Sequence, residues 1–282
     1  PSAPVLLSST FGRDWVTYGV AVRGNVAYLA KGKTVQIVDV SNPRKPATLG
    51  RYDEAFNALD IVVAGDHAYV ADGPLGLLIL DVSDPGNPRW AGSFDTEGFA
   101  RNILLKENLA IIGDAQGGLL MLDVSVPGRP EPVGRFDTGG AAAGLTVVGN
   151  HLYVTAEEDG LIVIDISDPA RPRRIGSCDT PGAARGVQVQ GNLAYVADDH
   201  AGLQVVDVSS TAPLRFLPPF RSASGAVHLF LEGAAGQRAT IQRTADFNAW
   251  ETWRQVVLPQ GPLEIIDPAE TSARRFYRAV GH

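Results

Sequence analysis

The chain has 282 residues, 45% hydrophobic and 20% charged, a composition typical of one sizeable globular domain with or without a small appendage. Its 31 acidic and 24 basic side chains give a net charge of −7, which argues against the sequence-independent nucleic-acid binding that clustered Lys and Arg support. The single cysteine, Cys178, excludes an internal disulfide and a cysteine-based zinc cluster, and no apolar run of about 18 residues predicts a membrane span.

The first predicted strand covers residues 4–10. Its beginning, Pro4-Val-Leu-Leu, matches Pro46-Ala-Thr-Leu 42 residues later, so it has the sequence of one strand of a longer repeat. The chain starts at Pro1 without a methionine, and we expect a processed or trimmed product that was secreted or periplasmic.

A repeat of 42 residues continues from this strand to about residue 210. Each copy contains the same phrase, as in LLILDVSDP and LIVIDISDP, with an aspartate at a fixed place. The five aspartates are Asp39, Asp81, Asp123, Asp165 and Asp207. A period in the low forties with several short β runs per unit is the signature of a propeller blade. We therefore predict an all-β protein whose main domain, 1–210, is a five-bladed β-propeller.

One copy of the repeat illustrates the strands expected in each blade. Four strands are predicted in it, at 143–148, 151–155, 161–166 and 173–178. A tight hairpin is expected at Gly149-Asn150, and the prolines of 167–172 break the chain because proline cannot donate to a β-ladder. Since a single sheet cannot bury both faces alone, the five copies are expected to stack around an axis.

Ring closure is predicted from the two ends of the repeat region. We expect the strand at 4–10 to complete the last blade beside Leu203–Val208 and to tie the ring together. Residues 212–218 are a second candidate for the same place. The segment 211–224, rich in proline and serine, is expected to be a linker.

The repeat stops at about Gly225, and 225–282 predicts five short strands with polar turns, compatible with a small antiparallel β-sandwich. The phrases Thr244–Trp250 and Arg275–Arg278 resemble a module at the C-termini of large bacterial extracellular proteins. We expect Trp250 and Trp253 to lie in the core of this module.

The repeats resemble the LVIVD family of bacterial and archaeal surface or secreted β-propellers, through the pattern AYVAD-x-x-x-GL-x-x-x-DVSDP-x-x-P over residues 4–218. The resemblance implies the fold and a secreted, periplasmic or cell-surface location, and it implies no defined activity. We expect a monomer.

One face of the predicted propeller carries most of the acidic loops, because the loop entering the innermost strand and the loop between the second and third strands share it. We call it the acidic face. The loops entering the innermost strands contribute Asp53, Asp95, Asp137 and Asp179. The other loops contribute Asp72, Asp114, Glu157, Glu158, Asp159, Asp198 and Asp199. Because four copies carry the first aspartate, we interpret it as a turn former rather than a ligand, and interpret Asp39 and its equivalents likewise.

Departures from the repeat predict the ligand-binding residues. Polar side chains interrupt Ala and Gly where the innermost strands begin, near the central channel. The candidates are Tyr18, Asp60, Arg101, Asn102 and Arg185, with Trp15 as a platform for stacking a sugar. Such a channel could hold a sugar or an anion, and it could equally be water-filled with an internal ion pair.

A carbohydrate-active enzyme, a glycoside hydrolase or lyase, is the alternative function. It would use the carboxylates Asp60, Glu157 and Asp198, with Arg101 and Arg185 as binders. Paired carboxylates serve glycoside hydrolysis at ~5–5.5 Å or ~6.5–9.5 Å separation. The sequence contains no G-x-S-x-G, H-E-x-x-H or P-loop motif.

Two acidic loops are weak candidates for a metal site. Their residues are Glu158, Asp159, Asp199 and His200, whose oxygens suit Ca²⁺ and whose Asp–His combination suits a transition metal. Neither loop has the spacing of a known calcium motif, and we expect no other cofactor.

We therefore expect a non-catalytic module that presents an acidic face to a glycan or protein partner. We also expect Cys178 to be a buried thiol, since it replaces the aromatic found at Tyr52, Phe94 and Phe136 in other copies.

Overall fold

The computed structural model describes residues 5–8, 16–115, 118–209, 215–222, 226–232, 238–244, 250–259, 262–267 and 276–281. Within these ranges the protein is built from β-strands and one short 3-10 helix, Asp199–Ala201. The chain forms two compact units, one of residues 1–188 and 196–204 and the other of residues 189–195 and 205–282. The domain limits expected from the sequence stay a prediction.

Each of the first four repeats folds into a four-stranded antiparallel sheet, here called a blade and numbered in chain order. Blade 1 contains Gly19–Arg23 (β1), Val26–Ala30 (β2), Val35–Asp39 (β3) and Ala47–Tyr52 (β4). Blade 2 contains Asp60–Ala64 (β5), His67–Ala71 (β6), Leu77–Asp81 (β7) and Arg89–Phe94 (β8). Blade 3 contains Ala100–Lys106 (β9), Leu109–Asp114 (β10), Gly118–Asp123 (β11) and Glu131–Phe136 (β12).

Blade 4 contains Gly144–Val148 (β13), His151–Thr155 (β14), Leu161–Asp165 (β15) and Arg173–Cys178 (β16), within one residue of the strands predicted for this copy. The fifth repeat forms a sheet of three strands among the described residues. These strands are Gly186–Gln190 (β17), Leu193–Ala197 (β18) and Leu203–Asp207 (β19).

The turns of the blades follow the predicted chemistry. The hairpin between the first two strands has a positive φ at Gly24, Gly65, Gly149 and Gly191, and Glu107 adopts it in blade 3. After the third strand, the Asp carboxylate accepts the main-chain N–H two residues on, as Asp123 does from Ser125 at 2.8 Å. The other four copies repeat this bond, so the prediction that these aspartates form turns is confirmed.

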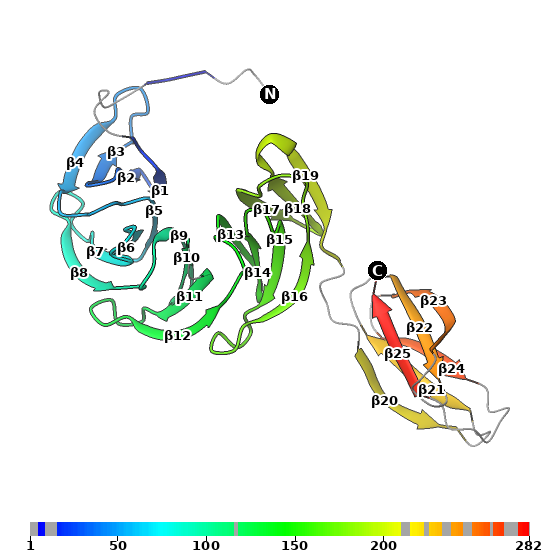
Figure 1. The fold of residues 1–282 in the computed structure, drawn as a ribbon. Coiled ribbons are helices and arrows are strands. Elements are labelled where there is room, and N and C mark those ends of the chain that lie inside the picture. Colours follow the sequence, from blue (N-terminus) through cyan, green and yellow to red (C-terminus); the bar gives the residue numbers. More distant parts are fainter. Residues whose placement is uncertain are drawn as a thin grey trace. The chain divides into compact units, whose positions relative to one another are not determined.

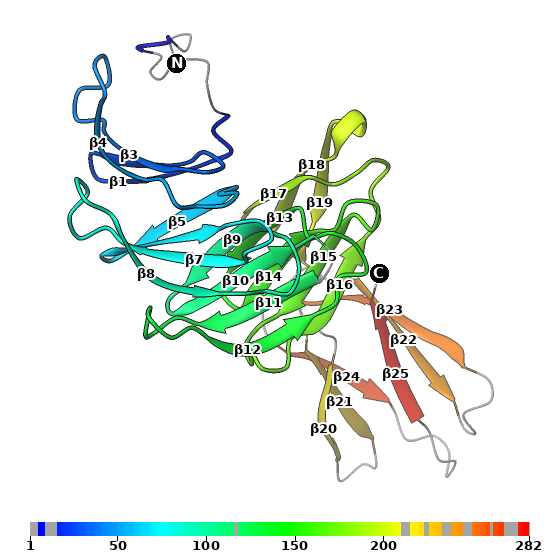
Figure 2. The same cartoon turned by 60° about the vertical axis from the view of Figure 1, so that its left-hand side comes forward.

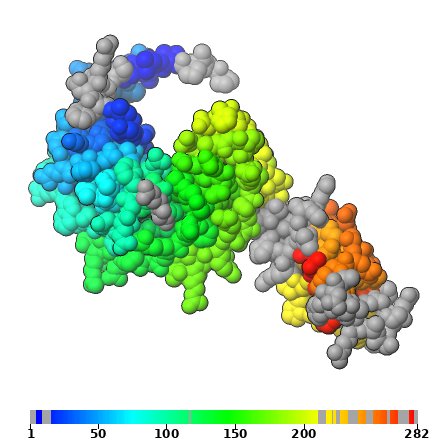
Figure 3. Space-filling model, in the orientation of Figure 1, coloured from blue at the N-terminus to red at the C-terminus, as the bar shows by residue number. Residues whose placement is uncertain are grey.

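Neighbouring blades share their cores. In Figure 1 the strands β1, β5, β9 and β13 lie on the inner side, and β4, β8, β12 and β16 lie on the outer side. Figure 2 shows the successive sheets stacked face to face, and the atoms of blades 2 to 4, cyan to green, are continuous in Figure 3. Ile37 of blade 1 and Leu80 of blade 2 belong to one buried cluster, and Ile79 and Ile112 join blades 2 and 3 in the next. Each blade thus buries a face only through its neighbour.

The closing strand predicted from the sequence is not seen in the described residues. Residues 5–8 belong to no strand, and Ser8 Oγ donates to the Pro43 carbonyl of blade 1 at 2.7 Å. Leu203 of β19 is 64% exposed, whereas its counterpart Leu161 in blade 4 is 1% exposed. The alternative segment, 212–218, is described only from residue 215. Ring closure and the count of five complete blades therefore stay predictions.

The second unit contains two three-stranded sheets, ordered β20-β21-β24 and β23-β22-β25. Their strands are Arg215–Arg221 (β20), Val227–Glu232 (β21), Arg238–Thr244 (β22), Glu251–Val257 (β23), Leu263–Asp267 (β24) and Phe276–Gly281 (β25). The five strands predicted after Gly225 are all present, and Leu231 and Ile241 from the two sheets share one core. Trp253 packs on this core, with the guanidinium of Arg254 4.8 Å from the centre of its ring.

Strand β20 lies in the segment expected to be a linker. It pairs with β21, and the ladder shifts register between Leu217 and Phe220. The two residues between them are prolines, which cannot donate to a ladder and are tolerated on an edge strand.

The expectation for Cys178 is wrong, because this thiol is exposed. The aromatic rings that stand at its place in blades 2 and 3, Phe94 and Phe136, pack against the cores shared with the next blade. A cysteine side chain is too short to fill the volume of such a ring, so it stays at the surface.

Candidate functional site

The loops assigned to the acidic face do meet at one end of the blades. The buried carboxylate of Asp72, which follows β6, accepts the N–H groups of Phe56 and Asn57 in the loop that enters β5. Asp198 in the fifth repeat does the same, accepting from Thr180 Oγ1 at 2.7 Å and from Gly182 N at 2.9 Å.

Asp198, proposed as a catalytic carboxylate, is therefore an internal support of its own loop. Its exposed fraction is 0%, and both oxygens have a donor. Asp72 and Asp114 occupy the same place in blades 2 and 3 and are also buried, so the role belongs to the repeat. The aspartates of the loops that enter the innermost strands bond within their own turns. Asp95 Oδ1 accepts from Glu97 N, and Asp137 Oδ1 accepts from Gly139 N.

Asp60 and Asn102 join neighbouring blades at the start of their inner strands. Asp60 Oδ2 accepts the N–H of Ile103 on β9 at 3.0 Å, and Asn102 Nδ2 donates to the carbonyls of Ala142 and Ala143 at 2.9 and 2.8 Å. Burial raises the pKa of the Asp60 carboxyl, while the N–H groups of Ile103 and Ile61 act in the opposite direction. Both side chains are interblade clamps in this structure.

Two other copies have glycine at this position, Gly19 and Gly144, because the inner strands there come too close for a side chain. A Cβ on Gly19 would lie 2.8 Å from the Cα of Asp60, and a Cβ on Gly144 would lie 2.8 Å from the Cα of Gly186. Real Cβ atoms essentially never approach so closely. At the other two junctions, a polar side chain at this position bonds to the next blade instead.

Four of the remaining candidates form an ion-pair network on the acidic face. Glu157 Oε1 lies 3.0 Å from Arg185 Nη1 and 3.4 Å from Arg101 Nη1, and Arg185 Nη2 lies 3.6 Å from Asp199 Oδ2. All four side chains are at least partly exposed, so each pair contributes about 0.2–1 kcal/mol at most. This is the internal ion pair that the sequence left open as one explanation of the arginines.

The two acids of this network have a strained backbone. Glu157 and Asp199 adopt φ values of 46° and 44° at a place where blades 1 and 2 have Gly32 and Gly73, with φ of 64° and 57°. Non-glycine residues in this left-handed region cost on the order of 1 kcal/mol or more. The ion pairs to Arg185 help to offset that cost.

The remaining candidates do not converge. Tyr18 is exposed next to Gly32, and His200 lies exposed in the 3-10 helix. Asp159 folds back toward Gly139, whose added Cβ would lie 2.9 Å from its Oδ2, and Glu158 is exposed beside it. Trp15 lies outside the described residues. In the part of the chain that the structure describes, no group of three His, Cys, Asp or Glu side chains could hold a metal ion.

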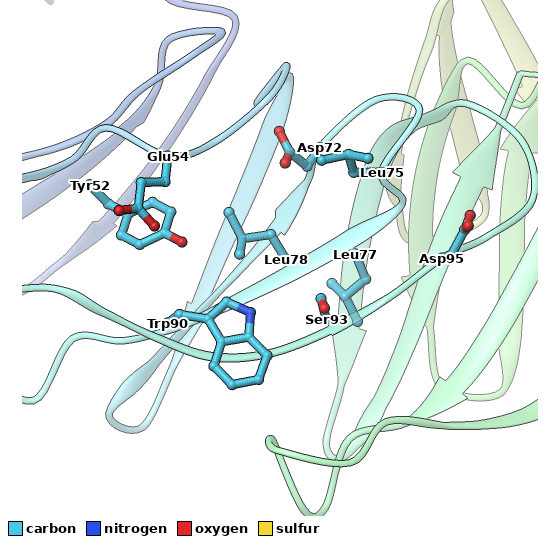
Figure 4. Close-up of a pocket in the computed structure, with 9 residues that line it drawn as sticks. All are labelled: Tyr52, Glu54, Asp72, Leu75, Leu77, Leu78, Trp90, Ser93 and Asp95. Atoms are coloured by element: carbon cyan, nitrogen blue, oxygen red, sulfur yellow. The ribbon is translucent and has the colours of Figure 1, made fainter.

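A pocket at the outer edge of the acidic face brings together residues that the sequence did not group. Its volume is about 370 Å³. The lining residues, shown in Figure 4, are Tyr52, Glu54, Asp72, Leu75, Leu77, Leu78, Trp90, Ser93 and Asp95. They come from the end of blade 1 and from the second, third and fourth strands of blade 2 with their loops. Two aromatic residues, three leucines and three carboxylates therefore line one hollow.

Trp90 owes its position to strand pairing. It lies opposite Leu80 in the ladder of β7 and β8, beside the bulge between Ile79 and Leu80. Directly opposed residues project from the same face of a sheet, and Leu80 packs in the core shared with blade 1. Trp90 thus extends toward blade 1, but at the outer edge, where 58% of it stays exposed. The equivalent residues in other blades are Thr48, Pro132 and Arg174.

The electrostatics of this pocket are negative. Burial raises the pKa of the Tyr52 hydroxyl, and the charges of Glu54 and Asp72 raise it further, together with a hydrogen bond to Glu54. Burial also raises the pKa of Asp72, against the N–H groups of Phe56 and Asn57. No Lys, Arg or His is among the lining residues.

Antiparallel sheets of this kind, packed face to face with adjacent inner strands, define a β-propeller. The chain belongs to the LVIVD repeat family, whose repeat matches residues 16–54, 57–96, 97–138, 139–180 and 181–216. The family match ends at residue 216, so the resemblance of the C-terminal module to secreted bacterial proteins stays a prediction.

One solved structure supports the propeller fold. BamB from Moraxella catarrhalis is 17% identical and superimposes over 80% of this chain and 71% of its own, with a TM-score of 0.56. The computationally designed protein Ika8 matches over 89% of both chains at 10% identity, with a TM-score of 0.49. No match was found among curated proteins. Among the described residues, no helix is long and apolar enough to cross a membrane.

Proposed function

We propose that this propeller is a non-catalytic interaction module that binds a protein partner through its acidic face, centred on the pocket between Tyr52 and Trp90. The observation that carries the proposal is the exposure of Trp90 at the mouth of that pocket. Tryptophan and tyrosine are enriched at protein interfaces, where they act as buried anchors surrounded by polar groups.

The carboxylates near the central channel support this proposal because each already has a partner within the fold. Asp60 binds the next blade, Asp198 supports its own loop, and Glu157 pairs with two arginines. The three candidate carboxylates share no hydrogen-bond partner. A glycosidase needs one carboxyl to donate a proton and another free to attack or to activate water, so the geometry favours binding over catalysis.

The proposal takes the protein as a monomer with no resident cofactor. It includes a secreted, periplasmic or cell-surface location, which rests on the resemblance to secreted propellers. A thermal shift of the full chain with Ca²⁺ against chelator tests the acidic loops at Glu158 and Asp199 for a metal. Fractionation of expressing cells tests the location.

The partner class is tested by selecting ligands of the full chain from a displayed protein library and, in parallel, from a glycan array. Each binder is then measured against E54Q/D95N, which removes two charges from the pocket. The matched control is D66N/D168N, which removes two charges from turns at the opposite end of blades 2 and 4. We expect protein ligands that lose affinity only with the first variant.

Three results would contradict the proposal. The first is binding of glycans alone, the second is a set of protein ligands insensitive to E54Q/D95N, and the third is turnover of a polysaccharide that Asp60→Asn abolishes.

A further inference from the structure

We propose that the pocket between blades 1 and 2 receives an arginine side chain of the protein partner. This inference rests on the proposed function and names the chemistry that the partner would present.

The walls of the pocket suit a flat, partly apolar cation. Trp90 offers an exposed ring, Tyr52 a second aromatic side chain from the facing blade, and Leu75 and Leu78 add apolar wall (Figure 4). The stem of an arginine packs on apolar surface, while its planar guanidinium stacks on an aromatic ring. Tryptophan is the strongest of the aromatic side chains for a cation.

Charge favours arginine over a neutral ligand. Glu54 and Asp95 are exposed on loops of the acidic face, and the buried carboxylate of Asp72 also lines the pocket. Oδ1 of Asp95 accepts from Glu97 N, and its other oxygen accepts no hydrogen bond from the residues that the structure describes. A carboxylate oxygen can accept from the guanidinium fork, whose five donors fit planar acceptors better than an ammonium does. Burial is the main cause of the raised pKa of Tyr52, and the charges of Glu54 and Asp72 add to it.

The repeat shows that the pocket is particular to this junction. The residue at the place of Trp90 is Pro132 in blade 3 and Arg174 in blade 4, and Cys178 replaces the facing aromatic after blade 4. At blade 4 the protein itself has an arginine where blade 2 has the ring. The combination of two aromatics with carboxylates therefore occurs between blades 1 and 2.

The test uses the full chain and a fluorescein-labelled Gly-Ser peptide with two arginines, compared with the same peptide containing citrulline. Citrulline keeps the shape and removes the charge. Fluorescence anisotropy should show binding of the arginine peptide, at least about tenfold weaker binding of the citrulline peptide, and weakening of the arginine peptide by added salt. Equal binding of both peptides would overturn the proposal, and a lysine peptide that binds as tightly would overturn the choice of arginine.

Two matched variant pairs locate the site. Trp90→Ala should weaken the arginine peptide about tenfold, equivalent to about 1.4 kcal/mol, and Trp90→Phe should retain part of the affinity. Phe56→Ala, which removes an equally exposed ring of the acidic face outside the pocket, should change the dissociation constant less than about twofold. Asp95→Asn should weaken binding about threefold to tenfold, while Asp137→Asn, in the same turn of the next blade, should not.

Equal losses from Asp95→Asn and Asp137→Asn would show diffuse attraction to an acidic surface and overturn the site. Because more than half of Trp90 is exposed, its variants should keep the melting temperature of the parent, and unchanged binding in a folded Trp90→Ala protein would also overturn it. If library-selected ligands depend on the acidic face but contain no arginine, this inference fails while the proposed function stands. If none depends on that face, the proposed function fails.

Discussion

The centre and the outer edge of the acidic face both carry residues that interrupt the repeat, yet the structure uses them in opposite ways. At the centre, Asp60 and Asn102 bond to the next blade. At the edge, Trp90 fills no core and stays exposed on the wall of a pocket that three carboxylates also line. A residue that departs from the repeat therefore has a role particular to its own blade. We interpret that role as structural where the side chain already bonds within the fold, and as functional where it does not.

The strand at 4–10 is predicted to join the two ends of the ring. Deleting residues 1–10 should cause aggregation or a large fall in melting temperature, because it would open the apolar edge of Leu203–Val208 to other chains. Removing 225–282 should be milder. Calorimetry and size-exclusion chromatography measure both effects. Equal stability of 11–282 and the full chain would show that 212–218 completes the last sheet instead.

The central clamps should affect stability without affecting binding. Asn102→Ala removes two hydrogen bonds and leaves two partly buried carbonyls unpaired, so it should cost about 1–3 kcal/mol of unfolding free energy. The neighbouring Arg101→Ala breaks an exposed ion pair and should cost less than about 1 kcal/mol. Urea unfolding measures both. A clamp variant as stable as the parent, or one that loses peptide binding, would break the distinction between centre and edge.

Two substitutions of Glu157 separate the effect of its left-handed backbone on stability from the effect of its charge. Glu157→Gly and Glu157→Ala both remove the ion pairs to the two arginines, and only glycine relieves the positive φ. The glycine variant should be more stable than the alanine variant by about 1 kcal/mol. Equal stabilities in urea unfolding would mean that the loop relaxes and that no strain is stored there.

The smallest expected effect concerns pH and a turn at the end away from the acidic face. The main-chain N–H and the hydroxyl of Ser125 lower the pKa of the exposed Asp123. A lowered pKa in the folded state gives stability above the unfolded value, about 3.9, that is lost as pH falls through the folded value. Asp123→Asn keeps an acceptor without the charge, so it should lose less stability than the parent between pH 5 and pH 2. Urea unfolding across this range checks it, and identical pH profiles would count against the linkage.

Much of the fold could be predicted because it is encoded locally and five times over. Turn aspartates such as Asp123 and the strand limits of blade 4 follow from a few adjacent residues. The partner of Asp60 could not be predicted, since Ile103 is 43 residues away and the contact depends on the spacing of two inner strands. The pocket was missed for the same reason, because a strand bulge and the packing of two blades bring Trp90 and Tyr52 to one hollow. The identity of Trp90 at a place held elsewhere by Thr48 and Arg174 was the available signal.

The clamps also bear on how such a chain can evolve. Each reaches forward, from blade 2 to blade 3 through Asp60 and from blade 3 to blade 4 through Asn102, while Gly19 and Gly144 mark junctions with no room for a side chain. Copies that arose by duplication have thereby acquired side chains that bond to one particular neighbouring blade. Excising one 42-residue unit by recombination would preserve the reading frame and the strand pattern but join two faces shaped for other partners. The repeats match one family model, yet two of their junctions depend on a particular side chain.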